Sequence, residues 1–430
     1  MTPESSFHPL IATVVGARPQ FIKAAPVSAA LHRAGLAERL IHTGQHYDAA
    51  MSEVFFQTLG LPEPAVHLGI GSATHGAQTG RMLEAVERVL LDWRPDLVLV
   101  YGDTNSTLAG SLAAAKLHIP VAHVEAGLRS FNPHMPEEIN RVLTDHVATV
   151  LFAPTDAAMA NLQKEGITSG VVRTGDVMFD AVRRFRAECA EAAEKVLETY
   201  HLEPRGFTLL TVHRAENTDD PTRWAGILEA IRRLTAGGLR ILWPVHPRVR
   251  DQVGAFDYDR LHLTPPLSYF EVQALLMHAK LVLTDSGGLQ KEAAFHAVPC
   301  VTLRDETEWV ELVAAGVNHL AGAEPDRIES LAHTVAWPAA GIPPELYGDG
   351  HAATAIADHL SLFRSPSRAI PPIAPSSVPP YPLRPSDEAT RGAPNAERRR
   401  FRSPRPAKRG APNAERRRLR SPRPAKRGEG

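Results

Sequence analysis

The sequence predicts an α/β protein built from two doubly wound parallel sheets. Short apolar runs, such as residues 97–101, alternate along the chain with segments of helix-favouring composition, such as residues 105–116. Apolar runs without polar alternation are typical of strands that are buried on both faces of a parallel sheet. The same alternation starts again after about residue 200, and this restart predicts a second sheet.

The first part of the chain carries the elements of one sheet. We expect strands at 11–15, 40–43, 97–101, 121–125, 150–153 and 171–175. We expect the main helices at 20–34, 80–91 and 105–116, with Pro26 forcing a kink or a restart in the first of them. Together these elements predict an N-terminal Rossmann-like domain over residues 1–180.

The second part repeats the pattern after a polar helix expected at 181–200. We expect strands at 207–212, 241–245, 281–284 and 298–303, and helices at 221–236, 270–278, 288–296 and 351–363. These elements predict a C-terminal Rossmann-like domain over residues 181–365, which ends in a closing helix.

Beyond this domain the composition changes. Residues 366–430 hold 17 Lys and Arg against 5 Asp and Glu, a net charge of +12, so the rest of the chain carries −13. Within them the segment GAPNAERRRFRSPRPAKR, from Gly392, recurs with one change from Gly410. The repeat has almost no apolar residues to bury, which predicts a disordered basic tail. Phe401 is the one aromatic residue of the repeats, so the composition favours a solvated extension over a nucleic-acid-binding arm.

Several classes of protein are disfavoured. The two cysteines, Cys189 and Cys300, have no CxxC spacing, which suits a reducing cytoplasm. The N-terminus lacks the features of a signal peptide, and no apolar stretch approaches the roughly 20 residues of a spanning helix. No His, Cys or Asp cluster has the spacing of metal ligands, and no serine elbow or phosphate-binding Walker sequence occurs. We therefore expect a cytoplasmic protein without a metal.

Acidic residues follow two predicted strands that we expect to be neighbours. Asp103 comes after the strand at 97–101, and Glu125 ends the strand at 121–125. In open α/β sheets the ligand binds outside the carboxyl ends of the strands. A third acidic position, Glu137 with Glu138, follows on the next loop. Carboxylates brought together are costly unless they are used or neutralised, so this cluster predicts a catalytic site.

In the second half, Asp285-Ser-Gly-Gly-Leu-Gln-Lys-Glu292 joins a strand to a helix. Gly287 and Gly288 let the backbone approach a ligand closely, and the helix N-terminus that begins near Ser286 suits a phosphate. Glu292, one to two turns into the helix, can accept bonds from ribose hydroxyls. An ordinary helix cap with glycines for packing is the alternative.

Basic and histidine side chains lie at the same strand ends. Arg18 and Lys23 follow the first strand, at the edge that also holds Asp103, where cations can hold a diphosphate. His213 ends a strand of the second half and is expected to face the gap between the domains. Surface charges and a buried structural histidine are the alternatives. We take His46, His123, His134 and His246 as structural residues or as residues that support the site from behind.

Eight motifs resemble, in order, those of the bacterial non-hydrolysing UDP-N-acetylglucosamine 2-epimerases, over roughly residues 10–362. They are Gly16-Ala-Arg-Pro-Gln with Lys23 and Pro26, Thr43-Gly-Gln-His, Tyr101-Gly-Asp-Thr, His123-Val-Glu-Ala-Gly-Leu-Arg129, Pro136-Glu-Glu-Ile-Asn-Arg141, His213-Arg-Ala-Glu-Asn, Asp285-Ser-Gly-Gly and Tyr347-Gly-Asp-Gly350. The resemblance implies a glycosyltransferase-B-like fold with a UDP-sugar in the inter-domain cleft, a homodimer and no cofactor.

The resemblance also implies roles for individual residues. Asp103, Glu125 and Glu137 would form the acid/base group, and His213 would reach the sugar or the diphosphate. Arg141 would lie beside Glu137. The residues that would hold UDP are Arg18, Lys23, Ser286, Gly287, Gly288 and Glu292.

The exact substrate and reaction stay open. The segment from Leu303 to Glu311, with Trp309, also resembles epimerases that act on UDP-2,3-diacetamido-2,3-dideoxyglucuronate, but N-acetylglucosamine is the first expectation. A glycosyltransferase of the same architecture, a hydrolysing epimerase and a non-catalytic sugar-nucleotide sensor compete with this expectation. The carboxylate set argues against a sensor, because binding UDP would not require it.

Overall fold

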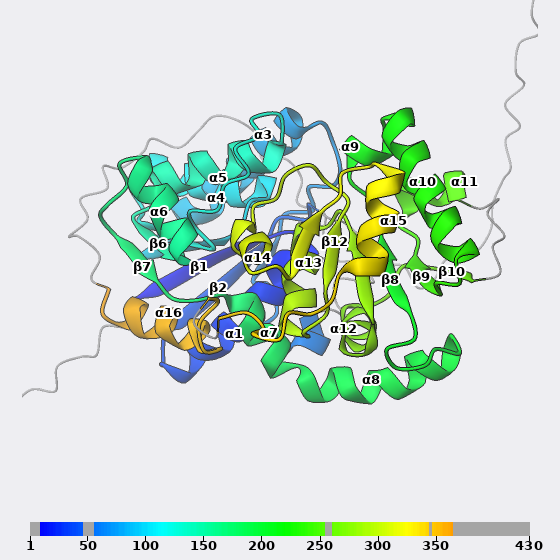
Figure 1. Ribbon diagram of the computed structural model, residues 1–430. Coiled ribbons are helices and arrows are strands. Elements are labelled where there is room, and N and C mark those ends of the chain that lie inside the picture. Colours follow the sequence, from blue (N-terminus) through cyan, green and yellow to red (C-terminus); the bar gives the residue numbers. More distant parts are fainter. Residues whose placement is uncertain (1–8, 46–55, 254–259, 344–345, 364–430) are drawn as a thin grey trace, which may run out of the picture. The chain divides into compact units, whose positions relative to one another are not determined.

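The computed structural model describes residues 9–45, 56–253, 260–343 and 346–363, and it contains two parallel sheets (Figure 1). The predictions for the basic tail and its repeat, and for the residues after Gln45 in the Thr43 motif, lie outside the described residues. The first sheet has the strand order β3-β2-β1-β4-β5-β6-β7 and the second β10-β9-β8-β11-β12-β13. All the pairings between described strands are parallel, which confirms the predicted fold class.

The predicted strands are all present, and three short ones are added. The strands are β1 (Leu10–Val15), β2 (Ala37–His42), β3 (Val66–His67), β4 (Leu97–Tyr101), β5 (Val121–Val124), β6 (Val150–Ala153), β7 (Val171–Arg173), β8 (Thr208–Thr211), β9 (Ile241–Pro244), β10 (Leu261–Thr264), β11 (Leu281–Thr284), β12 (Cys300–Thr302) and β13 (Asn318–Leu320). The added strands are β3, β10 and β13, and each is the outermost strand at an end of its sheet.

The helices connect these strands and lie along both sheets. They are α1 (Arg18–Arg33), α3 (His75–Trp93), α4 (Asn105–Lys116), α5 (Pro136–Val147), α6 (Asp156–Lys164), α7 (Val177–Arg184), α8 (Arg186–Thr199), α9 (Ala215–Thr218), α10 (Pro221–Ala236), η1 (Pro247–Val249), α11 (Arg250–Val253), α12 (Tyr269–His278), α13 (Gly287–Phe295), α14 (Val310–Ala314), α15 (Pro325–Thr334) and α16 (Ala352–Ser361). No helix among the described residues has the length and apolar character to cross a membrane.

Two helix predictions differ from the structure. The helix α1 runs through Pro26 without a restart. The segment expected as one polar helix at 181–200 is two helices, because the chain turns at Phe185, which is buried in the core and serves as the C-cap of α7 and the N-cap of α8.

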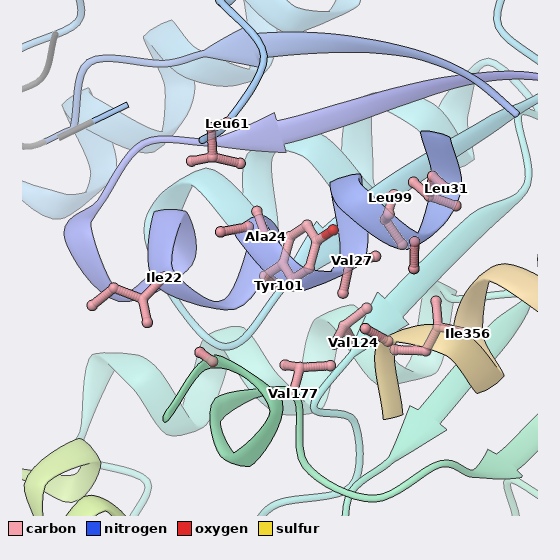
Figure 2. Close-up of a cluster of buried hydrophobic side chains, with 14 of the residues drawn as sticks. Ile22, Ala24, Val27, Leu31, Leu61, Leu99, Tyr101, Val124, Val177 and Ile356 are labelled. Carbon is pink, nitrogen blue, oxygen red and sulfur yellow. The ribbon is translucent and has the colours of Figure 1, made fainter. Parts of the chain in front are cut away.

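The largest buried cluster joins the first sheet to helices from distant parts of the chain (Figure 2). Leu99 and Tyr101 of β4 pack with Val27 of α1, Val177 of α7 and Ile356 of α16. The helix α16 follows the second sheet in the sequence, yet its contacts are with α1 and α7. These contacts cross the predicted domain boundary at residue 180, so the division of the chain into two domains stays a prediction.

Strand pairing places the carboxyl ends of β4 and β5 side by side. Tyr101 of β4 is the register partner of Val124 of β5. Each strand is followed directly by a residue with positive φ, Gly102 at 61° and Glu125 at 73°. His123 helps to hold this edge, because its Nε2 lies 2.7 Å from the carbonyl oxygen of Gly102 and its Nδ1 lies 2.6 Å from Asp145. The structural role expected for His123 is confirmed.

Candidate active site

Glu125 lies at the end of β5 with both of its carboxylate oxygens occupied. Lys23 of α1 binds Oε2, and Lys291 of α13 donates to Oε1 at 2.6 Å. Burial alone would raise the pKa of Glu125, but the charges of Lys23 and Lys291 outweigh it and lower the pKa to about 2. Glu125 is therefore an ionised carboxylate at neutral pH.

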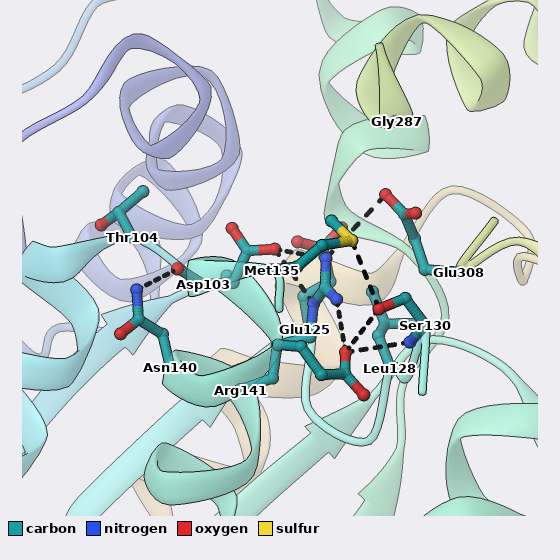
Figure 3. Close-up of polar contacts among 12 residues, drawn as sticks. Asp103, Thr104, Glu125, Leu128, Ser130, Met135, Asn140, Arg141, Gly287 and Glu308 are labelled. Atoms are coloured by element: carbon teal, nitrogen blue, oxygen red, sulfur yellow. Dashed lines mark hydrogen bonds and ion pairs between the residues drawn. The ribbon is translucent and has the colours of Figure 1, made fainter. Parts of the chain in front are cut away.

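Asp103 lies on the neighbouring strand end and pairs with Arg141 of α5 (Figure 3). Arg141 donates to Asp103 Oδ2 from Nε at 3.0 Å, and its Nη2 lies 2.7 Å from the same oxygen. The backbone carbonyl of Asp103 accepts a bond of 2.8 Å from Asn140. The side chain of Asp103 is 30% exposed, so it is held in place but still reachable from solvent.

Arg141 is the centre of an acidic cluster. Besides Asp103 it contacts Glu138 at 2.7 Å and lies 3.9 Å from Glu308, which comes from the second half of the chain. Burial would lower the pKa of Arg141, and the charges of Asp103, Glu308 and Glu138 raise it instead. Figure 3 shows Asp103 and Glu308 on opposite sides of the guanidinium. Arg141 thus links the strand ends of the first sheet to the second half.

The two adjacent glutamates of α5 have different environments. Glu138 is buried and accepts bonds from the backbone N–H groups of Ser130 and Phe131, both at 2.9 Å, and so fixes the loop before α5. Glu137 is half-buried, and its side chain makes no hydrogen bond or ion pair within the described residues. Its charge acts on His213. Arg141 therefore pairs with Glu138, while the place beside Glu137 that the resemblance implied for Arg141 stays a prediction.

The N-terminus of α13 faces this cluster. A Cβ atom on Gly287 would overlap Oε1 of Glu308, so only glycine fits beside that carboxylate. A Cβ atom on Gly288 would meet no atom within 4 Å. Ser286 is the N-cap residue, and its side chain makes no capping bond. The helix end therefore presents backbone N–H groups toward open space, where an anion can bind.

Asp285 organises the loop that carries His213. Fully buried, it accepts bonds from the backbone N–H groups of His213 at 3.0 Å and Arg214 at 2.9 Å. The His213 ring lies 3.4 Å from Asp285 and stacks on His246, with 5.3 Å between the ring centroids. Burial lowers the pKa of His213, Asp285 opposes this, and Arg214 and Arg248 add to it. The neutral imidazole is therefore favoured at pH 7.

Two further residues predicted to bind the nucleotide are Arg18 and Glu292. Arg18 is the first residue of α1 and is half-buried. Glu292 is buried in α13, where burial raises its pKa to about 7 although Gln273 and nearby lysines lower it. A carboxyl group with this pKa is half-protonated at neutral pH, so it can donate as well as accept a hydrogen bond.

Sequence reasoning missed three charged residues in the site. Lys291, only 1% exposed, pairs with Glu125 and also with Asp176, the N-cap of α7, at 2.6 Å. Burial would raise the pKa of Glu308, but the charges of Arg304 and Arg141 outweigh it and lower the pKa to about 2. Lys291 lies four residues after Gly287, which puts both on one face of α13, so the helical period was an available signal. Asp176 and Glu308 have no comparable signal in the sequence.

The arrangement can move protons beside a bound anion. Asp103 and Glu137 each have a carboxylate oxygen without a hydrogen bond within the described residues, while Glu125 and Glu138 are held on both oxygens. Arg141 and Glu308 lie between them and the N-terminus of α13. The site therefore combines carboxylates that could transfer protons with a helix end suited to a phosphate.

Comparison with known proteins identifies the family. The family model for UDP-N-acetylglucosamine 2-epimerase matches residues 29–361. A UDP-2,3-diacetamido-2,3-dideoxy-D-glucuronate 2-epimerase from Pseudomonas aeruginosa is 49% identical over 357 residues, which are 82% of this chain and 99% of that protein. A UDP-N-acetylglucosamine 2-epimerase from Escherichia coli K12 is 35% identical over 375 residues, which are 81% of this chain and 98% of that protein.

Solved structures give the same result. The Methanocaldococcus jannaschii UDP-GlcNAc 2-epimerase in complex with UDP-GlcNAc and UDP is 39% identical with a TM-score of 0.73, covering 82% of this chain and 99% of that one. The Neisseria meningitidis enzyme bound to UDP-GlcNAc is 30% identical with a TM-score of 0.75 and the same coverage. The resemblance read from the motifs is confirmed, and the chain belongs to the UDP-N-acetylglucosamine 2-epimerase family.

Proposed function

We propose that this chain catalyses the reversible epimerisation of UDP-N-acetylglucosamine at C2, giving UDP-N-acetylmannosamine for the synthesis of cell-surface polysaccharides. One observation carries the proposal. Asp103 and Glu308 lie on the two sides of Arg141, and Glu308 lies against Gly287 at the start of α13. Acid/base carboxylates are therefore adjacent to a helix end that can hold a diphosphate.

The chemistry explains why both parts are needed. The hydrogen at C2 of an acetamido sugar is not acidic, but it can be removed as the C1–O bond breaks and UDP leaves with the bonding electrons. The product is a glycal with a C1–C2 double bond. UDP then adds back to C1 while a proton is delivered to the opposite face of C2. Two faces of one carbon require two differently placed acid/base groups.

We assign the proton transfers to Asp103 and Glu137. Both have an oxygen without a hydrogen bond within the described residues, and they come from different elements, the end of β4 and the first turn of α5. Glu125 belongs to the same acid/base group. Its two oxygens are held by Lys23 and Lys291, so its carboxylate stays ionised. His213, as the neutral imidazole, would donate a hydrogen bond to the sugar or to the diphosphate.

The nucleotide is assigned to the facing elements. Backbone N–H groups at Gly287 and Gly288, with Ser286, would bind the diphosphate, and Arg18 and Lys23 would add positive charge. Glu292 would bind the ribose hydroxyls, and Arg141 would position the sugar through Asp103. Lys23 also contacts Glu125. Its ammonium group would therefore connect the negative charge that develops on the leaving diphosphate with the acid/base group.

We further propose a cytoplasmic homodimer. Cys189 and Cys300 are both free and buried, and burial raises the pKa of each thiol to about 12. Unreactive buried thiols suit a reducing compartment. The dimer rests on the family resemblance, and sedimentation equilibrium of the purified chain would test it.

A second substrate is favoured by a specific observation. The Pseudomonas aeruginosa relative, 49% identical over nearly its whole length, is named for the 2,3-diacetamido glucuronate. In this chain Trp309, part of the segment that resembles those enzymes, donates from Nε1 to the carbonyl of Gly287 at 2.9 Å. A residue of that segment thus supports the same helix end that would hold UDP.

Proton NMR of the purified chain with each UDP-sugar separates these functions. We expect UDP-N-acetylglucosamine to give a mixture with UDP-N-acetylmannosamine and little free UDP. Turnover of the uronate alone would instead assign that substrate. Stoichiometric release of free N-acetylmannosamine and UDP would indicate a hydrolysing epimerase, and turnover that requires an added acceptor would indicate a glycosyltransferase. No reaction of either sugar would contradict the proposal.

A further inference from the structure

Lys291 is a buried cation held by two carboxylates and one aromatic ring. Its Nζ lies 2.6 Å from Glu125 Oε1 and 2.6 Å from Asp176 Oδ2. The same atom lies over the Trp309 ring, 4.0 Å from the centroid. An ammonium group has three donors and no acceptor; two of the donors bind carboxylates here, and the charge lies over an aromatic face.

The charges around Lys291 keep it protonated although it is buried. Burial would lower its pKa, but the charges of Asp176 and Glu125 outweigh this and raise it. A lysine that stays protonated, is almost fully buried and is held by two carboxylates is not suited to take a proton from a sugar. Its influence on the reaction must therefore act through the groups that it holds.

The lysine connects the helix proposed to bind UDP with the carboxylate at the end of β5. Gly287 and Lys291 are one helical turn apart on α13. Trp309 contacts both, since its ring lies under Lys291 and its Nε1 donates to the carbonyl of Gly287. At its other end Lys291 fixes one oxygen of Glu125, whose backbone has a left-handed φ of 73°. Lys291 thus links the carboxylate of Glu125 to α13 and, through Trp309, to the start of that helix.

We propose that Lys291 is a positioning residue of the epimerase, which fixes the Glu125 carboxylate in its ionised form and in one orientation relative to α13. This inference rests on the proposed function. Lys23 holds only the other oxygen, Oε2, so without Lys291 the carboxylate would keep one contact and could rotate about it. Nothing in the motifs assigned a role to this lysine.

A test of this role must separate the effect of Lys291 from the effects of the other charged groups around Glu125. The groups that face it are Lys23 from α1, Lys291 from α13, Asp176 at the start of α7 and, more distantly, the Tyr347 hydroxyl. Replacing Lys291 by methionine leaves Glu125 with Lys23 alone and removes the lysine that pairs with the buried Asp176. The pKa of Glu125 then rises, because burial is no longer offset by two cations.

The first measurement needs no activity. In the wild type the lowered pKa of Glu125 stabilises the fold above about pH 4.5, and this contribution is lost as the pH falls toward 2. In Lys291→Met the carboxylate takes up a proton at higher pH, which relieves the unpaired charge. The loss in Tm relative to wild type should therefore be at least about twofold larger at pH 8 than at pH 5. Ile356→Ala, a cavity variant in the core of α16, should lose the same amount at both pH values.

The second measurement is the pH dependence of kcat. The ratio of the Lys291→Met kcat to the wild-type kcat should fall by about tenfold between pH 8 and pH 5, since one pKa unit is a tenfold change in the ionised fraction, while KM stays within about threefold. Asp176→Asn keeps a capping oxygen for α7, but it leaves Glu125 as the only carboxylate that pairs with Lys291. The kcat ratio of Asp176→Asn to wild type should stay level or rise between pH 8 and pH 5. The kcat ratio of Ile356→Ala should stay level over the same range.

The outcomes separate this inference from the proposed function. An active wild type, with a Lys291→Met variant whose Tm loss and kcat ratio do not change with pH, would overturn the role of Lys291 alone. A wild type that turns over neither sugar would overturn the proposed function, and the positioning role with it. A kcat ratio that falls equally in Lys291→Met and Asp176→Asn would show that the cluster of Lys291, Glu125 and Asp176 is only structural. This result would overturn the positioning role.

Discussion

Arg141 contacts Asp103 through two nitrogens, and both contacts end on the same oxygen. Nε and Nη2 lie 3.0 Å and 2.7 Å from Oδ2, while Oδ1 has no hydrogen bond within the described residues. The guanidinium thus orients the carboxylate and leaves one oxygen available for proton transfer. Glu125, with both oxygens bound to lysines, has the opposite arrangement.

We expect Asp103→Asn to lower kcat by at least about 10²-fold with little effect on UDP affinity. The amide keeps the shape and can still accept from Arg141, but it cannot carry the C2 proton. Steady-state kinetics and calorimetric titration with UDP measure the two quantities. An Asp103→Asn variant that keeps near-normal turnover would remove Asp103 from the reaction.

The neighbouring glutamates of α5 provide a matched pair. Glu137→Gln should lower kcat by about 10²-fold or more and leave the free energy of unfolding nearly unchanged, since Glu137 has no hydrogen bond within the described residues. Glu138→Gln should cost about 3 kcal/mol of stability, because it removes a buried charge that holds Arg141 and two backbone N–H groups. Urea unfolding and kinetics on both variants check this. The reversed pattern would mean that the two roles are exchanged.

The paired glycines of α13 make a second comparison. Gly287→Ala should destabilise the protein by about 1–3 kcal/mol, because the added methyl group overlaps Glu308 in a packed site. Gly288→Ala points into open space and should leave Tm unchanged while it weakens UDP binding. Thermal unfolding with and without UDP measures both effects. Equal Tm losses in the two variants would contradict the packing described here.

The raised pKa of Glu292 predicts that the stability of the protein depends on pH. Its folded-state pKa of about 7 exceeds the usual 4.5, so the native state binds more protons in this window and loses stability as the pH rises from about 4.5 through 7. Glu292→Gln should therefore be more stable than wild type at pH 8, by up to about 3 kcal/mol, and the advantage should vanish below about pH 4.5. Urea unfolding at pH 5 and pH 8 tests the trend. An advantage that does not change with pH would contradict the assignment.

The strands that carry the site were predictable because each is a buried apolar run. All five residues of β4 and all four of β5 are buried. The strands that were missed are short and include polar residues, such as the two-residue β3 and Asn318–Leu320 of β13. A run of that length carries no periodic signal that distinguishes it from a loop.

The charged contacts of the site were only partly predictable. Asp103 and Glu125 follow from the rule that ligands bind at strand ends. Lys291 meets Glu125 across 166 residues of sequence and Asp176 across 115, so their pairing depends on how the two sheets pack. The pairing of Arg141 with Glu138 has a similar cause, since Glu137 and Glu138 both lie in the first turn of α5 and only the packed structure shows which one is buried.

The central claim is that the hydrogen at C2 is removed within this site and replaced by a proton that exchanges with solvent. Turnover of UDP-N-acetylglucosamine in deuterium oxide, followed by proton NMR of the C2 position, tests it most directly. We predict loss of the C2 proton signal in both epimers as they approach equilibrium, with little free UDP. Epimerisation that proceeds with the C2 hydrogen fully retained would contradict the account.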